Sequence, residues 1–286
     1  MDQIKLFIEL TRIKKPIGYM LLFWPCAWGL TIAYDFSGEL TTYIFYLLLF
    51  LTGAILMRSA GCIVNDIFDK NFDKKVFRTK NRPIASKKIS VKKGIFYSLF
   101  LCLLAFLVLI QFNYFTILLA LGSMPLAFTY PLMKRYTYWP QLFLGITFNY
   151  GLILGWTAIK GEINFTPLIF YVGTVFWTLG YDTIYGFQDL KDDEIIGLKS
   201  TSIKFKKNIK TFVAINYLIS FFFLIYSFKN NFDKILFTIF LMFYFVSLIW
   251  QIKVFKKNNP QKCLKAFKLN YLSGLLLFLA LFSINL

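Results

Sequence analysis

Long runs of apolar residues alternate with short polar segments along the whole chain. Each run is close in length to the roughly 20 residues that a helix needs to cross the hydrocarbon core of a bilayer. The pattern therefore predicts an all-α polytopic membrane bundle. The nine expected transmembrane helices cover residues 17–34, 43–64, 95–111, 114–132, 139–158, 165–187, 211–228, 234–252 and 268–285.

The polar segments are short apart from a few basic loops, and none reads as a linker. We therefore expect a single integral membrane domain over residues 1–286. The first segment, MDQIKLFIELTRIKKP, looks amphipathic and leads into a helix that starts at a proline. Because no small-residue cleavage site follows it, we expect this segment to remain in the mature protein.

Composition and charge agree with a membrane protein and give it an orientation. The chain is 58% hydrophobic and 20% aromatic, which is typical of membrane proteins. Of the 32 Lys and Arg residues, 28 fall in the N-terminal segment and in four loops, at residues 65–94, 133–138, 188–210 and 253–268. By the positive-inside rule these segments are cytoplasmic and the C-terminus is outside. We expect the inner membrane of a bacterium, with any active site facing the cytoplasm.

The net charge of +18 could suggest a nucleic-acid partner. Lysines at alternate ends of hydrophobic spans are explained by topology and by anionic lipid headgroups, so we expect a lipid bilayer and no nucleic acid. The chain has no histidine, and its four cysteines form no CxxC pair, so zinc and haem lack their usual ligands. A bound metal would be a hard cation held by oxygen.

A first acidic cluster, NDIFDKNFDKK, ends the second apolar run. In a helix, Asp66, Asp69 and Asp73 share one face at i, i+3 and i+7, and Asn65 lies beside Asp69 at i, i+4. Carboxylates in such a row repel one another and are costly at the edge of hydrocarbon, so they need positive charge between them.

A second acidic cluster, YDTIYGFQDLKDDEIIGLKS, ends the sixth run, four spans later. Asp182, Asp189 and Asp193, at i, i+7 and i+11, are expected to share a face of a helix. The recurrence predicts two four-helix pseudo-repeats plus one further helix, and repeats of this kind often build a site at their interface.

Magnesium fits such clusters, because it takes carboxylate oxygens together with substrate phosphate oxygens. Neighbouring basic side chains would then pair with phosphate charge. One cluster alone is more typical of a solvated helix end, but two at matching positions favour a site for a lipid diphosphate, with its tail between the helices. The basic residues considered for the phosphate are Lys70, Lys74, Arg78, Lys80, Arg82 and Lys199.

The stretches RSAGCIVNDIFDKNFDKKVFRTKNRPIAS and YDTIYGFQDLKDDEIIGLKST resemble the two aspartate-rich signatures of the UbiA family of intramembrane prenyltransferases. The resemblance extends to KKPIGYMLLFWPCAWGL, TYPLMKRYTYWPQLFLG and CLKAFKLNYLSGLLLF, and so covers essentially the whole chain. It is strongest for bacterial members that act on 4-hydroxybenzoate in ubiquinone synthesis.

The resemblance implies a site that binds Mg²⁺ and a polyprenyl diphosphate and moves the prenyl group to the ring carbon ortho to the hydroxyl of 4-hydroxybenzoate. By this resemblance the first metal is held by Asn65, Asp66, Asp69 and Asp73. The second is held by Asp182, Asp189 and Asp193. Asp66, Asp69, Asp182 and Asp189 are then catalytic, and Asp182 or Asp189 is a candidate to accept the ring proton.

Further side chains are candidates for the organic substrates. Tyr130 and Tyr185 lie near the cytoplasmic ends of their predicted helices, where an aromatic face would stabilise an allylic cation, so Tyr185 is a further catalytic candidate and Tyr130 a substrate-binding one. Arg58 lies inside a predicted membrane helix, two turns before Asp66, and such an arginine is a functional candidate for the acceptor carboxylate. The remaining substrate-binding candidates are Lys80, Arg82, Lys134, Arg135 and Lys199.

Two other interpretations stay open from the sequence. One is a member of the same family with another aromatic acceptor, such as a naphthoate or homogentisate. The other is a membrane transporter, although transporters usually place acidic residues near the bilayer midplane and these clusters lie at one face.

Overall fold

A computed structural model describes residues 3–285, which form helices joined by turns and loops, with no strand in that range. In chain order the helices are α1 (Gln3–Thr11), α2 (Pro16–Ala33), α3 (Leu40–Asp73), α4 (Val91–Leu109), α5 (Tyr114–Thr129), η1 (Tyr130–Leu132), α6 (Met133–Tyr136), α7 (Pro140–Lys160), α8 (Phe165–Gly186), α9 (Leu190–Ile195), α10 (Thr201–Lys204), α11 (Ile209–Ser227), η2 (Lys229–Asn231), α12 (Ile235–Val254), α13 (Pro260–Lys268) and α14 (Asn270–Ser283).

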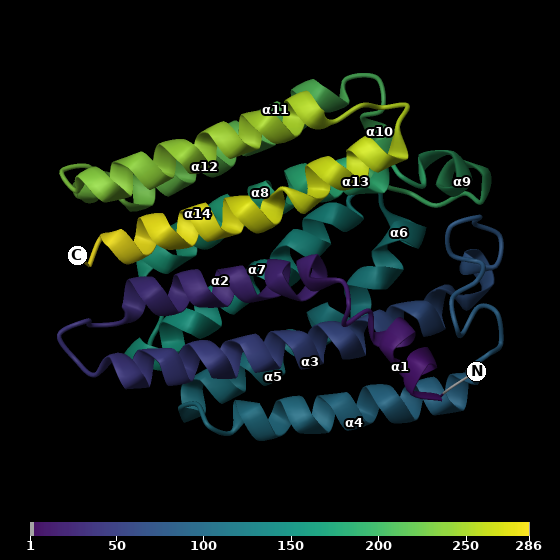
Figure 1. Cartoon of the computed structure of the whole chain (residues 1–286), viewed down its shortest axis with the longest axis horizontal. Helices are drawn as coiled ribbons and strands as arrows, with labels where there is room; N and C mark the ends of the chain where they lie inside the picture. Colours follow the sequence, from purple (N-terminus) through teal and green to yellow (C-terminus); the bar gives the residue numbers. More distant parts are fainter. Residues whose placement is uncertain (1–2, 286) are drawn as a thin grey trace.

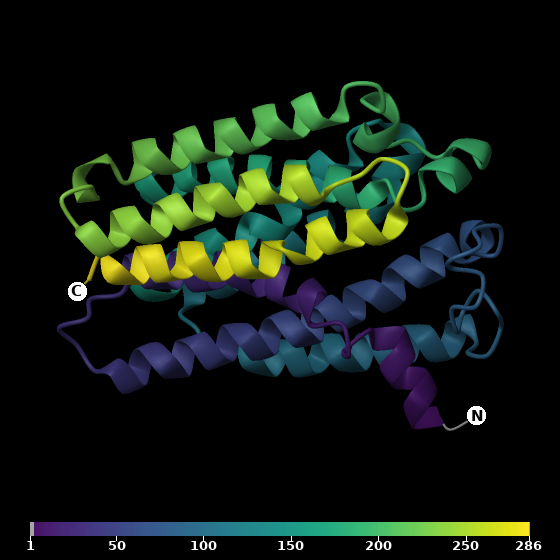
Figure 2. The same ribbon diagram turned by 45° about the horizontal axis from the view of Figure 1, so that its top comes forward.

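The long helices lie side by side along one axis of the molecule (Figures 1 and 2). The short helices α1, α6, α9 and α10 gather at one end, and the C-terminus lies at the other. The loops expected on the cytoplasmic side therefore come together at a single end of the bundle.

Within residues 3–285, eight helices are long and apolar enough to cross a membrane, counting α5 to α6 and α13 to α14 as one span each. The 22-residue helix α8 is not one of these eight but lies alongside them, packed against both α7 and α11. The expected all-α membrane bundle is confirmed, with eight candidate spans among residues 3–285 where the sequence predicted nine.

Helix pairing follows the two predicted repeats. In the first half α3 packs on α4, and in the second half α8 packs on α11. The first helices of the halves, α2 and α7, pack against each other in the middle, and α14 lies against α2 and α12. The ends of α3 and α8, which carry the acidic clusters, therefore take corresponding places.

The contact between α2 and α7 is close enough to require glycine. A Cβ atom on Gly155 would lie 2.2 Å from the backbone oxygen of Cys26, and one on Gly29 would lie 2.0 Å from that of Leu152. Small residues let membrane helices approach in this way. The backbones of the two halves thus meet directly.

Some predicted boundaries differ from the structure. The helix expected over 43–64 continues as α3 to Asp73. The helix expected over 114–132 ends at Thr129, where Pro131 interrupts it, and continues as η1 and α6. At the C-terminal end, α13 begins at Pro260, after Asn259 accepts a hydrogen bond from the Lys262 backbone N–H.

Candidate functional site

The first acidic cluster lies on the last two turns of α3. Asp66, Asp69 and Asp73 are all buried, and Asn65 is half-buried beside them. The helix has 34 residues and is about 51 Å long at 1.5 Å per residue. Because the hydrocarbon core is about 30 Å thick, α3 is long enough to extend beyond it. The predicted row of carboxylates on one helix face is confirmed.

Arginine side chains from two other segments reach this row. Arg12, just after α1, donates from Nη2 to Oδ1 of Asp66. Arg82, in the loop after α3, donates from Nη1 to Oδ1 of Asp66 at 3.1 Å and to Oδ2 of Asp73 at 2.8 Å. Buried carboxylates are thus balanced by charge-assisted hydrogen bonds.

The helix α6 supplies two more cations. Lys134 donates from Nζ to Oδ2 of Asp69. Arg135 donates to the backbone oxygen of Phe68 at 2.7 Å, and its Nη2 lies 4.0 Å from Oδ1 of Asp69. This Oδ1 is buried and has no hydrogen-bond partner within residues 3–285.

The second acidic cluster is split between two helices. Asp182 is on α8, which ends at Gly186, whereas Asp189 precedes α9 and Asp193 lies on it. The expectation that the three share one helix face is therefore wrong, because the chain turns between them.

The turn nevertheless brings the second cluster to the first. Arg78, in the loop after α3, donates from Nε to Oδ1 of Asp189 at 2.7 Å and from Nη2 to Oδ2. Arg78 thus ties the loop that follows the first cluster to Asp189 of the second.

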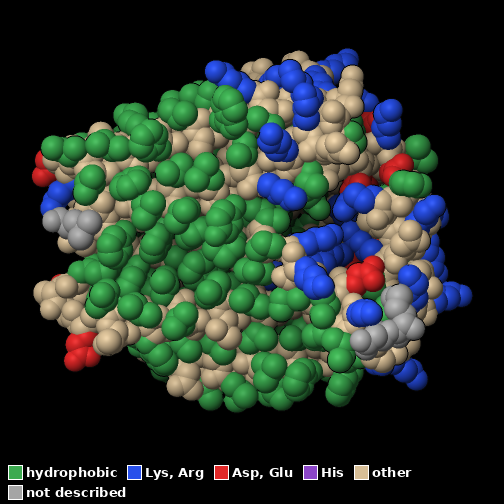
Figure 3. Space-filling model, in the orientation of Figure 1, with side chains coloured by type: hydrophobic (Ala, Val, Ile, Leu, Met, Phe, Trp, Pro, Cys, Tyr) green, Lys and Arg blue, Asp and Glu red, His purple; other side chains and the backbone are tan. Residues whose placement is uncertain are grey.

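Charged side chains of both signs are close enough together at this site to shift one another's pKa. Partial burial and the positive charges of Arg12, Arg78 and Arg82 lower the pKa of Lys15. Burial, and next the charge of Asp189, raise the pKa of Asp193 to about 7. Figure 3 shows Lys and Arg side chains crowded at this end of the bundle around a hollow that also exposes acidic side chains. The arrangement suits a ligand with several negative charges together with a cation.

A second group of predicted residues lies deeper. Arg58 lies with its guanidinium carbon 5.6 Å from the centre of the Phe148 ring, and Tyr130 meets the same ring edge-on at 6.2 Å. The Nε of Arg58 is buried and has no hydrogen-bond partner in the described part of the chain. Arg58 is close enough to Asp182 for their charges to interact. A buried guanidinium with unused donor capacity is suited to a carboxylate ligand.

The space for Arg58 depends on a glycine of α2. A Cβ atom built on Gly18 would lie 3.0 Å from Nε of Arg58. The absence of a side chain at this position therefore leaves room for the guanidinium.

Tyr185 lies between the cations that surround the acidic clusters and the deeper group of Arg58 and Tyr130. Its half-buried ring is 4.5 Å from that of Phe267 and 6.0 Å from the guanidinium carbon of Arg78. Tyr185 thus lies near the end of α8, where the sequence placed it.

Two predicted substrate-binding lysines are placed elsewhere. Lys80 is exposed, with Nζ 4.7 Å from the centre of the Phe77 ring. Lys199 donates to the backbone oxygen of Tyr136 at 3.1 Å and so ties the segment before α10 to α6. Neither lysine pairs with a site carboxylate within residues 3–285.

Sequence reasoning missed Arg12 and Lys15 as site residues. Both belong to the segment that was interpreted as an amphipathic leader to the first span. A usable signal was present in the sequence. Both residues are basic and shortly precede Pro16, which starts a helix at the same end of the bundle as both acidic clusters.

The carboxylate and amide oxygens present are the ligand types that a hard divalent cation prefers. The unpartnered Oδ1 of Asp69 is one oxygen with coordination capacity to spare. In the described residues, no three His, Cys, Asp or Glu side chains converge closely enough to share one ion as they stand. The donor set fits a metal, with the basic side chains now occupying part of it.

Comparison with protein families and curated proteins identifies relatives. The model of the UbiA prenyltransferase family matches residues 22–281. The mitochondrial 4-hydroxybenzoate polyprenyltransferase of Rattus norvegicus is 49% identical over 209 residues, which is 73% of this chain and 55% of that protein. The Caenorhabditis elegans protein of the same name is 45% identical over 212 residues, which is 74% of this chain and 59% of that protein. The matched part thus spans little more than half the length of these relatives.

Solved structures share the fold. The apo structure of a UbiA homolog from Aeropyrum pernix K1 has a TM-score of 0.76 at 21% identity, covering 91% of this chain and 96% of that one. A UbiA homolog from Archaeoglobus fulgidus bound to GPP and Mg²⁺ has a TM-score of 0.72 at 16% identity, covering 98% and 99%.

Proposed function

The chain belongs to the UbiA prenyltransferase family, and we propose that it transfers a polyprenyl group from a polyprenyl diphosphate to the ring carbon ortho to the hydroxyl of 4-hydroxybenzoate, in ubiquinone biosynthesis. The names of relatives at 45 to 49% identity support this acceptor. The observation that carries the proposal is the meeting of both acidic clusters with one set of basic side chains at one end of a membrane bundle.

The diphosphate end of the donor is bound by the basic side chains. Arg12, Arg78 and Arg82 pair with the carboxylates, and Lys15 lies close enough to these arginines for their charges to lower its pKa. As the allylic C–O bond breaks, the bonding electrons leave with the diphosphate, and these cations stabilise the added charge. Lys134 adds a fifth cation from α6.

Mg²⁺ is the proposed cofactor. Asn65, Asp66, Asp69 and Asp73 would hold one ion and Asp182, Asp189 and Asp193 would contribute to a second. When bound, Mg²⁺ neutralises charge on the diphosphate oxygens. Four of these carboxylates, Asp66, Asp69, Asp73 and Asp189, pair with arginine or lysine in the structure, so the same cations would be available to the phosphate oxygens if the carboxylates held metal.

The acceptor is placed by the deeper group. Arg58 binds the carboxylate of 4-hydroxybenzoate through its unused donors. Tyr130 and Tyr185 present aromatic faces to the allylic cation and exclude water that would capture it. The ring carbon forms the new C–C bond, and the displaced ring proton passes to a carboxylate. We assign this role to Asp182 rather than Asp189, because the charge of Asp182 interacts with that of Arg58 in the deeper group.

The location is proposed from the charge pattern. The basic loops at the active-site end support a site on the cytoplasmic face of a bacterial inner membrane. The mitochondrial names of the relatives make the mitochondrial inner membrane the alternative.

An acceptor assay tests the proposal. Membranes containing the chain are incubated with a polyprenyl diphosphate, Mg²⁺ and 4-hydroxybenzoate, a naphthoate or homogentisate in turn. We expect prenylated 4-hydroxybenzoate. Turnover of a naphthoate or homogentisate without turnover of 4-hydroxybenzoate would reassign the acceptor. Ion flux in liposomes that survives Asp66→Ala and Asp182→Ala, with no prenyl transfer by the unmodified chain, would instead indicate a transporter.

A further inference from the structure

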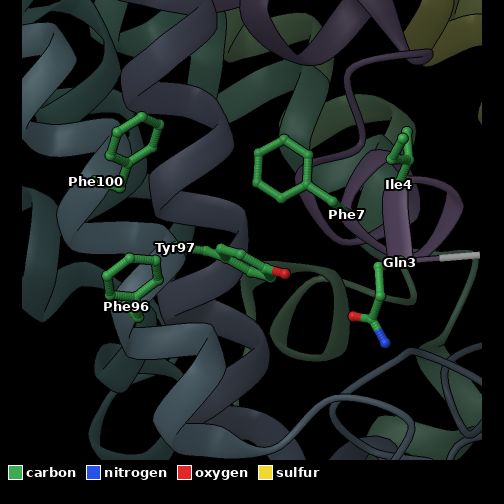
Figure 4. A pocket seen from close by; sticks show the side chains of 6 residues that line it. All are labelled: Gln3, Ile4, Phe7, Phe96, Tyr97 and Phe100. Atoms are coloured by element: carbon green, nitrogen blue, oxygen red, sulfur yellow. The ribbon is translucent and has the colours of Figure 1, made fainter.

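An apolar groove of about 370 Å³ lies between α1 and α4 at the basic end of the bundle (Figure 4). Five of its six lining residues are aliphatic or aromatic. They are Ile4 and Phe7 of α1 and Phe96, Tyr97 and Phe100 of α4, with Gln3 as the sixth. The groove is therefore suited to a hydrocarbon chain.

The groove is separate from the candidate active site. Helix α4 packs on α3 through Gly94, where a Cβ atom would lie 3.4 Å from Cδ1 of Ile67 and 3.6 Å from Cγ2 of Ile63. The carboxylates Asp66 and Asp69 of α3 face arginine and lysine side chains instead. Helix α3 thus lies between the groove and the carboxylates.

The groove opens at the outside of the bundle. Helix α4 lies at the edge of the molecule in both ribbon views (Figures 1 and 2). Phe96 is 65% exposed and Phe100 is 49% exposed. Because α4 is long and apolar enough to cross a membrane, we expect these exposed side chains to face lipid acyl chains rather than water.

The polar end of the groove carries positive charge. Lys93 donates from Nζ to Oε1 of Gln3 at 2.6 Å and lies 5.7 Å from the centre of the Tyr97 ring. It lies in the first turn of α4, VKKG, which has no acidic residue and where the helix dipole favours an anion. Apolar walls below a cation at headgroup level match the two ends of an anionic phospholipid.

We propose that the groove binds one acyl chain of an anionic phospholipid, whose headgroup phosphate is held by Lys93. The donor of the proposed reaction is not the expected occupant, because α3 separates the groove from the diphosphate-binding cations. A zwitterionic phospholipid has the same kind of acyl chain, but its headgroup has no net charge and is attracted less strongly to Lys93.

Lipid in the groove would also support the active site through α1. Leu6 and Leu10 of α1 are buried in one apolar cluster with Ile63 of α3. The helix ends next to Arg12, which pairs with Asp66. A chain packed between α1 and α4 therefore holds Arg12 in place. This consequence for activity rests on the proposed function, whereas lipid binding itself does not.

Lipid retention by the purified full-length chain tests the proposal. The protein in detergent is mixed with equal amounts of phosphatidylglycerol and phosphatidylcholine, and bound lipid is counted by native mass spectrometry. We expect phosphatidylglycerol to be preferred. Lys93→Gln should lower its retention about fivefold, the effect of losing roughly 1 kcal/mol of attraction from one lysine. Phe100→Ala should lower retention of both lipids.

Two matched variants serve as controls. Lys92→Gln removes the adjacent exposed lysine, and Leu103→Ala removes an exposed leucine of α4 that does not line the groove. Both should retain lipid like the unmodified chain, and thermal unfolding shows whether each variant is folded. Equal retention of the two lipids, or equal losses for Lys92→Gln and Lys93→Gln, would overturn the proposal. Displacement of phosphatidylglycerol by geranylgeranyl diphosphate would also overturn it. The assay involves no prenyl transfer, so its failure is distinct from failure of the proposed function.

Discussion

Arg78 joins the two halves of the site, because its Nε donates a hydrogen bond to Oδ1 of Asp189 at 2.7 Å, across 111 residues of chain. Its Nη2 donates to the other oxygen of the same carboxylate. This fork-like geometry is available to arginine and not to lysine. Arg78 thus fixes Asp189 to the loop after α3, while Lys134, which pairs with Asp69, interacts electrostatically with Asp193.

Replacing Arg78 by lysine tests the role of its contact with Asp189. Arg78→Lys keeps the charge but loses the two-fold contact, so we expect kcat/KM for the prenyl diphosphate to fall about tenfold, as for loss of one charged hydrogen bond. Lys206, which pairs with Glu194 on the same face of the protein, provides a control. Lys206→Gln should leave kcat/KM unchanged. Unchanged kcat/KM in Arg78→Lys would show that the fork is dispensable.

Asp69→Asn should reduce turnover about 100-fold or more while the protein still folds. The amide keeps the shape of the carboxylate but removes its charge and weakens its capacity to bind a cation. Turnover is compared with the thermal unfolding midpoint and folded yield. Asp233→Asn, at the opposite end of the bundle from the site, is the control. A parallel loss of folding and turnover would indicate that Asp69 has a structural role.

The Mg²⁺ requirement should depend on pH through Asp193. Its raised pKa, about 7, means that the carboxyl is protonated below pH 7 and charged above it. A proton must leave before a metal binds, so the Mg²⁺ concentration for half-maximal activity should rise by up to about tenfold per pH unit below 7 and be level above it.

The measurement is a Mg²⁺ titration of prenyl transfer after chelator treatment, between pH 5.5 and 8.5. Asp193→Asn should need more Mg²⁺ at pH 8 and should lose most of the slope below pH 7. A variant with the same slope as the unmodified chain would assign the titration to another group. Full activity after removal of all divalent cations would contradict the metal requirement itself.

Gly18→Ala should weaken acceptor binding selectively. The added Cβ lies 3.0 Å from Nε of Arg58, so the guanidinium must shift away from its present position. We expect KM for 4-hydroxybenzoate to rise roughly tenfold while KM for the prenyl diphosphate stays the same. Gly122→Ala, where a Cβ meets no atom of the described residues within 4 Å, should change neither constant. Equal changes in both KM values would remove Arg58 from the acceptor site.

Gly155→Ala should destabilise the bundle. The new Cβ would lie 2.2 Å from a backbone oxygen and 2.6 Å from a backbone nitrogen of α2, so α2 and α7 must move apart. Overpacking of this kind typically costs about 1 to 3 kcal/mol, seen as a lower unfolding midpoint in detergent. Gly53→Ala meets no atom within 4 Å in residues 3–285 and should be neutral or slightly stabilising. A midpoint for Gly155→Ala equal to that of Gly53→Ala would contradict the close contact.

The fold and the first cluster could be predicted because both depend on local periodicity. Apolar runs of membrane length define the spans, and the 3.6-residue helical repeat places Asp66, Asp69 and Asp73 on one face. The second cluster did not follow the same rule, because the chain turns after Gly186 without a proline to signal the end of the helix. Periodicity holds only as far as the helix continues.

The basic half of the site was harder to predict, because long side chains reach their partners from distant segments. Arg12 meets Asp66 across 54 residues, and nothing local distinguishes it from the other basic residues of its segment. Lys199 and Lys80 have the right charge near the right motif, yet they contact Tyr136 and Phe77. Composition indicates that cations surround the carboxylates, while tertiary packing decides which ones.

The length of α3 bears on how two unlike reactants meet. With 34 residues it is longer than the hydrocarbon core requires, so we expect its acidic end to reach the phosphate headgroups, where a polyprenyl diphosphate in the bilayer carries its own phosphates. On the proposed function, the donor enters sideways without rising out of its leaflet, and the small aromatic acid arrives from water without sinking into hydrocarbon. A few extra turns of α3 thus let a donor from the membrane and an acceptor from water meet at the same depth.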